Sequence, residues 1–306
     1  MPTPPSAPWA TLTGCDKYGP FADLHVQDVV QRLRWCPPGS FQMGSPEGEA
    51  GRYDREGPQH EVSLSAGVWM ADSPVTQALW LAVMGENPSH FADPAHLDRP
   101  VERVDWKQAA RFCALLEERL QRAGFSDDGL VFRLPTEAQW EHACRAGTQT
   151  ATYAGDLTLR GGNDAPELHD IAWYGGNSGV DYELAGGYDS SSWPNKQHPH
   201  SKAGTRVVKQ KLPNAWGLYD SLGNVWECCA DAWDGKGYPG GARVDPLGEA
   251  GPSRAYRGGS WWDDAQRVRA AYRRASGPSL RGDRLGLRLS RGRAHQTSRL
   301  KSPGSE

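Results

Sequence analysis

The chain has 306 residues and a net charge of −3, from 34 basic and 37 acidic side chains. This length allows one large domain or two small ones. No run approaches the ~18 apolar residues of a membrane span, and the first residues lack the apolar segment of a signal peptide. These features exclude a helical membrane protein, and we expect no membrane partner. The 36 Gly, 23 Pro and 13 Trp residues predict a loop-rich chain whose indoles anchor irregular segments.

Charge is unevenly distributed along the chain. Residues 257–306 hold twelve Lys or Arg against four Asp or Glu, which leaves the first 256 residues with a net charge of −11. A basic C-terminal end can meet a phosphate backbone, or its arginines can pair with acidic residues of the same fold. We favour internal pairing for the arginines within 257–289. Because the tail lacks the interleaved aromatic residues of single-strand binders, we do not expect nucleic acid as a partner.

The six cysteines show no metal or redox spacing. None forms a CxxC pair or a zinc-like arrangement. Cys113 and Cys144 fall in predicted helices, which is typical of buried small apolar residues. We therefore expect a reducing, cytoplasmic setting.

The N-terminal part of the chain predicts short strands. A Pro-rich lead segment over 1–24 precedes strands expected over 26–35, 40–44 and 60–70. Gly-rich and polar segments separate these strands and indicate loops. Because no linker or internal repeat interrupts the pattern, we predict one domain over 25–291.

Helices are expected only in the first half of the chain. They should begin after Thr76, Asp105 and Thr136, whose side-chain oxygens can cap free N–H groups. From 148 to 215 the pattern weakens, and Gly, Asn, Asp, Ser and Pro dominate with occasional Trp. A long irregular region of this kind is rarely without a function. Residues 292–306 indicate a disordered basic tail.

Residues 257–289 contain two kinds of position. Small and apolar residues such as Gly258, Gly259 and Trp261 can hold a strand or a tight turn. The residues between them follow no periodicity and mix indole, carboxylate, amide, hydroxyl and guanidinium groups, which suits a contact surface. A solvated loop with incidental charges is the alternative interpretation. The candidate contact residues are Trp262, Asp263, Asp264, Gln266, Arg267, Arg274, Ser276, Ser279, Arg281, Asp283 and Arg284.

The two ends of this stretch alternate apolar residues in the manner of strands. RGGSW (257–261) and LGLRL (285–289) are therefore predicted to be neighbouring strands of one sheet. Consecutive strand residues point to opposite faces, so Trp261 should be buried and Trp262 exposed. The loop between the strands should bring the candidate side chains to one exposed face.

A series of segments follows one another in a recognisable order. They are FQMGSP (41–46), DREGPQHEV (54–62), SPVTQALW (73–80), RPVERVDW (99–106), FRLPTEAQWEHACRAG (132–147), NAWGLYDSLGNVWE (214–227), RGGSW (257–261) and LGLRL (285–289). Together they resemble the formylglycine-generating enzyme family over roughly residues 35–291. The resemblance implies an irregular single α+β domain related to the C-type lectin fold.

The chain departs from this family where the family does its chemistry. The formylglycine-generating enzyme itself, which this chain resembles, binds copper through two cysteines that follow RGGSW. A soft d¹⁰ copper ion needs thiolate ligands. In this chain Asp263 stands at the expected position of the first copper-binding cysteine, and the second expected position falls near Val268. Residues 262–274 contain no cysteine. Cys228 and Cys229 lie elsewhere and are poor substitutes.

The related sulfoxide synthases bind iron largely through His of an additional helical domain. That domain is missing here, and the His198-Pro-His200 loop is a weak metal candidate. We therefore expect neither copper nor iron and no catalysis. A metal-dependent oxidoreductase of the formylglycine-generating enzyme or sulfoxide synthase type remains the alternative.

A second resemblance fits residues 257–289 better. Their length and their alternation of fixed and free positions are similar to the C-terminal variable region of diversity-generating retroelement variable proteins. The resemblance implies a non-enzymatic protein that binds a ligand through residues 262–284. The expected partner is a protein or another macromolecule.

The family resemblance also implies a structural calcium site beside GNVWE (223–227). Asp220 and Glu227 would supply carboxylates, and Gly223 and Val225 would supply backbone carbonyls. Such all-oxygen ligation from a tight loop is what calcium requires. Alternatively, the two carboxylates only cap the turn.

Overall fold

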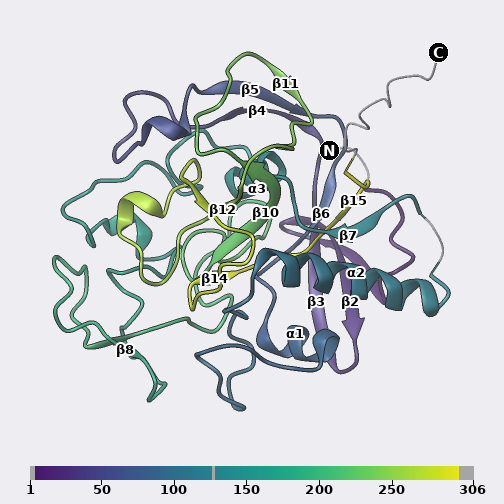
Figure 1. Cartoon of the computed structure of the whole chain (residues 1–306), viewed down its shortest axis with the longest axis horizontal. Coiled ribbons are helices and arrows are strands. Elements are labelled where there is room, and N and C mark those ends of the chain that lie inside the picture. The colour runs from purple at the N-terminus through teal and green to yellow at the C-terminus, as the bar shows by residue number, and fades with distance from the viewer. Residues whose placement is uncertain (1–3, 126–127, 296–306) are drawn as a thin grey trace.

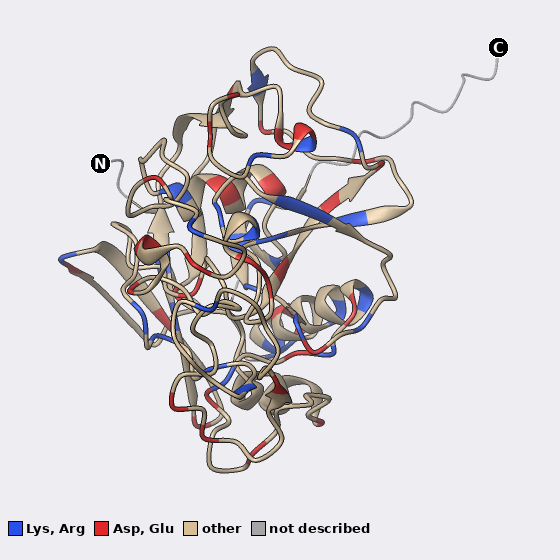
Figure 2. Ribbon diagram, turned by 90° about the vertical axis from the view of Figure 1, so that its left-hand side faces the viewer, with Lys and Arg blue, Asp and Glu red and all other residues tan. Residues whose placement is uncertain are grey.

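In the part of the chain that the structure describes, four sheets and three α-helices, joined by long loops, form the α+β domain that the sequence predicts (Figure 1). The computed structural model describes residues 4–125 and 128–295. None of the helices in these residues is long and apolar enough to cross a membrane. The predicted tail over 292–306 lies mostly outside the described residues. Figure 2 shows basic and acidic residues interspersed along the chain.

The largest sheet has six strands, in the order β1-β2-β3-β6-β15-β7. Residues 12–24, which we assigned to a lead segment, belong to this sheet. The strand predicted over 26–35 is present but begins three residues later, at Val29, because Gln27 has a φ of +53° and turns the chain into a hairpin. The strands are β1 (Leu12–Asp16), β2 (Gly19–Val26), β3 (Val29–Cys36), β6 (Val68–Ala71), β15 (Ser290–Gly292) and β7 (Val131–Arg133).

Each of the three helices begins directly after its predicted capping residue. The side chains of Thr76, Asp105 and Thr136 accept N–H groups at the starts of α1 (Gln77–Met84), α2 (Trp106–Arg122) and α3 (Glu137–Arg145). In α2 one apolar stripe is buried, as expected of an amphipathic surface helix. Nearly every residue of α3 is buried, because this helix contacts three neighbouring strands near the centre of the molecule (Figure 1).

The four-stranded sheet positions the candidate residues. Its order is β13-β12-β10-β14. The prediction that RGGSW and LGLRL are neighbouring strands is therefore wrong, since β10 lies between β12 and β14. The strands are β10 (Trp226–Trp233), β12 (Ser253–Arg257), β13 (Arg273–Ser276) and β14 (Leu285–Gly286).

RGGSW also leaves the sheet at its first residue. Gly258 and Gly259 adopt φ values of +96° and +77°, a region that favours glycine. A Cβ atom on Gly258 would lie 2.7 Å from the Ser221 carbonyl oxygen. The two glycines therefore turn the chain away from β12, and residues 258–272 form a loop instead of a strand.

The remaining elements are short. A three-stranded sheet contains β11 (Arg243–Val244), β5 (His60–Leu64) and β4 (Gly39–Met43), and lies at the top of Figure 1. The long region 148–215 contains only β8 (Tyr188–Asp189), β9 (Lys202–Ala203) and one short 3₁₀-helix, η2 (Pro166–Leu168). Two further 3₁₀-helices are η1 (Asp54–Glu56) and η3 (Ala265–Arg267).

Candidate ligand-binding surface

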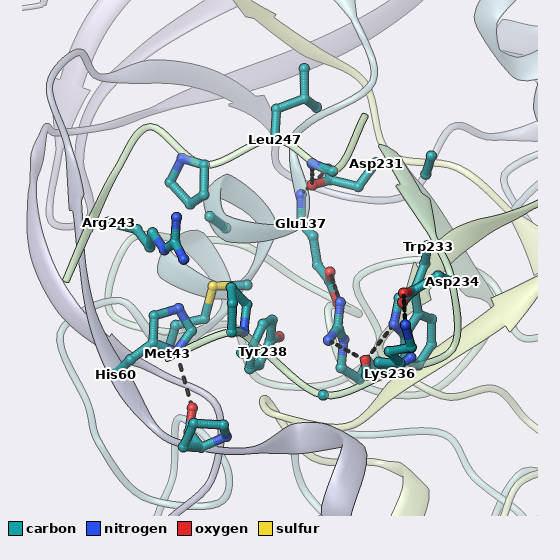
Figure 3. A pocket seen from close by; sticks show the side chains of 18 of the residues that line it. Met43, His60, Glu137, Asp231, Trp233, Asp234, Lys236, Tyr238, Arg243 and Leu247 are labelled. Atoms are coloured by element: carbon teal, nitrogen blue, oxygen red, sulfur yellow. Dashed lines mark hydrogen bonds and ion pairs between the residues drawn. The ribbon is translucent and has the colours of Figure 1, made fainter. Parts of the chain in front are cut away.

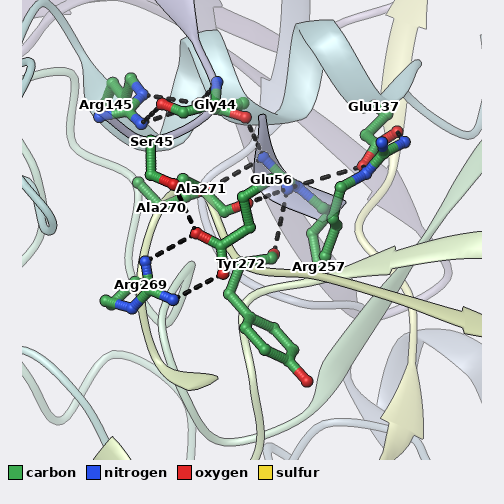
Figure 4. Close-up of polar contacts among 12 residues, drawn as sticks. Gly44, Ser45, Glu56, Glu137, Arg145, Arg257, Arg269, Ala270, Ala271 and Tyr272 are labelled. Atoms are coloured by element: carbon green, nitrogen blue, oxygen red, sulfur yellow. Dashed lines mark hydrogen bonds and ion pairs between the residues drawn. The ribbon is translucent and has the colours of Figure 1, made fainter. Parts of the chain in front are cut away.

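Buried arginines fix the loop that leaves β12 (Figure 4). The fully buried Arg257 pairs with Glu141 and donates to the carbonyl oxygens of Ala270 and Ala271 at 2.9 and 2.8 Å. These bonds tie the start of the loop to its end. Because an Arg side chain offers five donors in a rigid fork, one residue can hold several loop carbonyls at once.

A second buried arginine holds the middle of the same loop. Arg269 donates to both carboxylate oxygens of Glu56, at 2.6 and 2.8 Å, and also pairs with Glu49. It reaches the Gly51 carbonyl oxygen at 2.7 Å as well. The polar segment after β4, which the sequence predicts only as a loop, therefore forms the acidic partner of the 257–273 stretch (Figure 4). This confirms internal pairing for these arginines.

Four of the predicted contact residues, Asp263, Arg267, Arg274 and Arg284, meet in one pocket of 380 Å³. We call it the arginine pocket. It contains four guanidinium groups, because Arg55 joins the three predicted arginines. The lining residues are Arg55, Trp226, Trp233, Gly235, Asp263, Arg267, Tyr272, Arg274, Ala275 and Arg284.

Carboxylates balance only part of the positive charge in the arginine pocket. Asp263 Oδ1 lies 3.4 Å from Arg267 Nη1, and Asp264 lies 3.5 Å from Arg267 Nε. Burial alone would lower the pKa of Arg267, but these carboxylates raise it. Arg274 forms no ion pair within the described residues, and its guanidinium lies 5.6 Å from the Trp226 ring. Arg274 is therefore available to an acidic ligand.

The expectation of exposure is wrong for Asp263 and Ser276, which are buried. The Asp263 carboxylate accepts hydrogen bonds from Trp226 Nε1 at 2.8 Å and from the Ser260 hydroxyl. The Asp263 side chain therefore forms the floor of the arginine pocket and orients Trp226, which is part of the wall. Ser276 lies in β13, opposite Arg254 of β12.

Trp261 and Trp262 differ in burial as predicted, although the reason we gave is wrong. Trp261 is 0% exposed and Trp262 is 38% exposed. Both lie in a turn instead of a strand. The Trp261 Nε1 donates to the Asp283 carbonyl oxygen at 2.9 Å, which holds the indole inside. Trp262 lies 5.3 Å from the Arg284 guanidinium and so borders the arginine pocket.

Sequence reasoning missed the aromatic neighbours of Trp262. The ring of Trp193 lies 4.8 Å from that of Trp262, and the ring of Tyr188 lies 5.7 Å from it. Both come from the irregular region 148–215. An isolated Trp in a Gly-rich polar segment was the available signal, and we interpreted Trp193 only as an anchor. The surface is therefore built from two separate segments of the chain.

The other predicted residues surround these groups. Asp264 and Gln266 are half-buried beside η3, and Ser279 is exposed. Arg281 and Asp283 line a different pocket of 440 Å³ together with Arg103. Arg281 Nε also lies 3.1 Å from an Asp105 oxygen. The predicted set therefore spans two adjoining parts of the surface and does not line one pocket.

Comparison with known sequences identifies the scaffold. Residues 23–293 match the sulfatase-modifying factor enzyme 1-like domain. The chain belongs to this family. The formylglycine-generating enzyme of Thermomonospora curvata is 28% identical over 86% of this chain and 94% of that protein. The chaperone protein LppX of Paenibacillus barcinonensis is 30% identical over 54% of this chain and 61% of that protein.

A solved structure provides a comparison of the fold. Treponema denticola variable protein 1 superposes with a TM-score of 0.69 and 31% sequence identity, over 88% of this chain and 98% of that chain. The fold class and both resemblances derived from the motifs are therefore confirmed. The likeness to a variable protein spans nearly the whole domain.

The structure places the expected copper positions of the family in unsuitable surroundings. The Asp263 carboxylate is hydrogen-bonded in the pocket floor, and Val268 is buried in an apolar cluster. Cys228 and Cys229 lie next to each other in β10 but pack into two different apolar clusters. Burial raises the pKa of both thiols well above its usual value. These two cysteines therefore cannot bind one metal ion together.

The carboxylates expected to bind calcium have other partners. Glu227 accepts from Arg288 at 2.7 and 2.8 Å and from Trp140 Nε1 at 2.6 Å. Asp220 Oδ2 accepts the Lys209 N–H at 2.7 Å, and burial raises the pKa of Asp220 to about 6.

The other two expected ligands lie in the turn between these carboxylates. Val225 is buried, and Gly223 donates its N–H to the Gly258 carbonyl oxygen at 2.8 Å. Arg288 already supplies positive charge to Glu227, whereas Asp220 forms no ion pair within the described residues. Asp220 fits a calcium ligand better than Glu227 does.

Proposed function

We propose that the chain is a non-enzymatic ligand-binding protein whose contact surface comprises the arginine pocket and the aromatic group Trp262, Trp193 and Tyr188. The observation that carries this proposal is the meeting of four guanidinium groups beside an exposed indole. Aromatic and Arg side chains dominate binding energy at protein interfaces. Carboxylates are natural partners of guanidinium groups, because the two can pair through two parallel hydrogen bonds.

The partner that fits is a macromolecule presenting acidic side chains, and a protein suits best. The 380 Å³ pocket has room for one or two side chains, while the aromatic rim can pack against apolar residues beside them. The likeness to Treponema denticola variable protein 1 supports this use of the surface. A cytoplasmic partner is consistent with six unpaired cysteines in the described residues.

Peptide selection tests this function without knowledge of the natural ligand. A random peptide library would be selected on the wild-type protein and on an Arg274→Gln, Arg284→Gln double variant. We expect peptides rich in Asp and Glu on the wild type and loss of that enrichment on the variant. Equal enrichment on both proteins would refute the assignment. An Arg122→Gln variant, altered at an exposed helix end, is the matched control.

Oxidoreductase activity is the alternative that the relatives named formylglycine-generating enzyme favour. It would require a redox metal and soft ligands. Elemental analysis of the purified protein distinguishes the two functions. Stoichiometric copper or iron, together with oxygen consumption in the presence of a thiol peptide, would replace the binding function.

We also infer a structural calcium site at Asp220. Calcium should raise the unfolding temperature of the wild type, since a ligand that binds only the folded state stabilises it. An Asp220→Asn variant should lose this response. An unchanged unfolding temperature of the wild type in millimolar calcium would rule the site out.

A further inference from the structure

A further cavity, of 860 Å³, lies beneath the loop formed by residues 234–250 (Figure 3). This loop connects β10 to β12 and contributes β11 to the three-stranded sheet. The cavity shares only Trp233 with the arginine pocket. It is therefore a separate site, and nothing in the proposed function uses it.

The walls of this cavity are mainly apolar. Figure 3 shows Leu247 on one side of the space and Met43 and Tyr238 on another. Volumes of about 300–1,000 Å³ with apolar walls and a few polar groups are typical of small-molecule sites. The Tyr238 hydroxyl is buried and has no hydrogen-bond partner among the described residues.

The acidic groups around the cavity are already compensated. Glu137 pairs with Arg273 at 2.5 Å, and Asp234 pairs with Lys236 at 3.2 Å. The Asp231 carboxylate accepts backbone N–H groups of Glu137 and Gly248 at 2.7 and 2.8 Å. Glu137 and Asp234 are thus paired with cations, and both Asp231 oxygens accept backbone N–H groups, so none of these carboxylates is left without a partner.

One positive charge remains without a partner. Arg243 in β11 forms no ion pair within the described residues, and its guanidinium is turned toward the cavity (Figure 3). The nearby His60 ring is held by a 3.1 Å hydrogen bond between its Nδ1 and the Pro58 carbonyl oxygen. Because that carbonyl only accepts, Nδ1 is the donor. The cavity therefore combines an apolar interior with one free guanidinium.

We propose that this cavity binds a small organic acid with an apolar body, whose carboxylate pairs with Arg243. The apolar body would pack against Met43, Trp233 and Leu247. A singly charged acid balances the one free guanidinium, whereas a neutral ligand leaves it unpaired.

Calorimetric titration with 2-naphthoate and its uncharged amide tests this site. We expect 2-naphthoate to bind the wild type with one-to-one stoichiometry and roughly tenfold more tightly than 2-naphthamide, the usual effect of one charged hydrogen bond. Arg243→Gln should remove this difference by weakening only the acid. Leu247→Trp should weaken both compounds to a similar extent, because the larger side chain occupies part of the apolar space.

Two controls keep the test decisive. Arg274→Gln, in the arginine pocket, should leave naphthoate binding unchanged. Thermal unfolding should show that each variant is folded, and Arg243 is exposed, so its substitution tests the site even where Leu247→Trp does not fold. Absence of naphthoate binding to the wild type, or an equal effect of Arg243→Gln on acid and amide, would overturn the proposal.

Discussion

Residues 257–289 contain two groups of arginines that have opposite roles. The first group is buried and supplies the fold with internal ion pairs. It comprises Arg257, Arg269, Arg273 and Arg288. The second group is partly or fully exposed and reaches the binding surface. It comprises Arg267, Arg274, Arg281 and Arg284.

The difference between the groups lies in their acceptors. Arg269 has two glutamates and a carbonyl oxygen within hydrogen-bond distance, whereas Arg274 has no acidic partner in the described residues. A buried guanidinium is tolerated only when such acceptors replace its lost water. The buried arginines therefore fix the backbone, whereas Arg274 is free to contact a ligand.

The largest expected effect separates two arginines that are two residues apart. Arg269→Gln should lower the free energy of unfolding by about 3–5 kcal/mol, because it leaves buried carboxylates unpaired. Arg267→Gln should cost about 1 kcal/mol or less, since the side chain of Arg267 is 40% exposed. Denaturant unfolding of both variants measures the difference. Equal losses would show that the two groups are not distinct.

Low pH should destabilise the fold through Glu141, the partner of the buried Arg257. Charge on Arg257 and Arg145 holds the pKa of this buried carboxyl below its usual value, even though burial opposes this. The stabilisation is therefore present above the ordinary pKa of about 4.5 and is lost as pH falls through the folded value. Glu141→Gln should be less stable at pH 7 by about 3–5 kcal/mol and should depend less on pH below 4.5. Thermal unfolding between pH 2 and pH 7 checks both expectations.

Substitutions of the adjacent Trp261 and Trp262 should also differ in their effect on the free energy of unfolding. Trp261→Ala should cost about 3–5 kcal/mol, as for other buried aromatic residues. Trp262→Ala should cost no more than about 0.5 kcal/mol, the usual range for surface changes. Chemical unfolding of the pair is the measurement. A comparable loss for Trp262→Ala would mean that this residue is part of the core, and the binding surface would lose its anchor.

The smallest effects are expected at the edge of the surface. Arg281→Ala and Asp264→Ala should each change the unfolding free energy by about 0.5 kcal/mol or less. Arg281 is suited to this test because its side chain is 55% exposed despite its contact with Asp105. A loss above about 2 kcal/mol for Arg281→Ala would move it into the structural group.

Local features were predictable from the sequence, and long-range pairing was not. Thr76, Asp105 and Thr136 specify helix starts through their own side chains, so their prediction needed no tertiary information. The insertion of β10 between β12 and β14 depends on contacts across about sixty residues. No local pattern encodes that order.

The same limit applies to the candidate surface. The sequence indicated that Arg267, Arg274 and Arg284 belong to a contact region, but Arg55 joins their pocket from a distant loop. The sequence also could not distinguish the buried Asp263 from exposed neighbours of similar polarity. The Asp263 carboxylate is hydrogen-bonded to Trp226. Burial of a charged residue is decided by partners that lie far away in the chain.

Anchoring both ends of the 257–289 stretch makes this protein a suitable frame for directed evolution. Arg257 ties the first end to α3 through Glu141, and Arg288 ties the second to β10 through Glu227. Side chains such as Trp262, Arg274 and Arg281 can therefore be randomised while the backbone path stays the same. A combinatorial library at these positions would yield new affinity reagents without redesign of the interior.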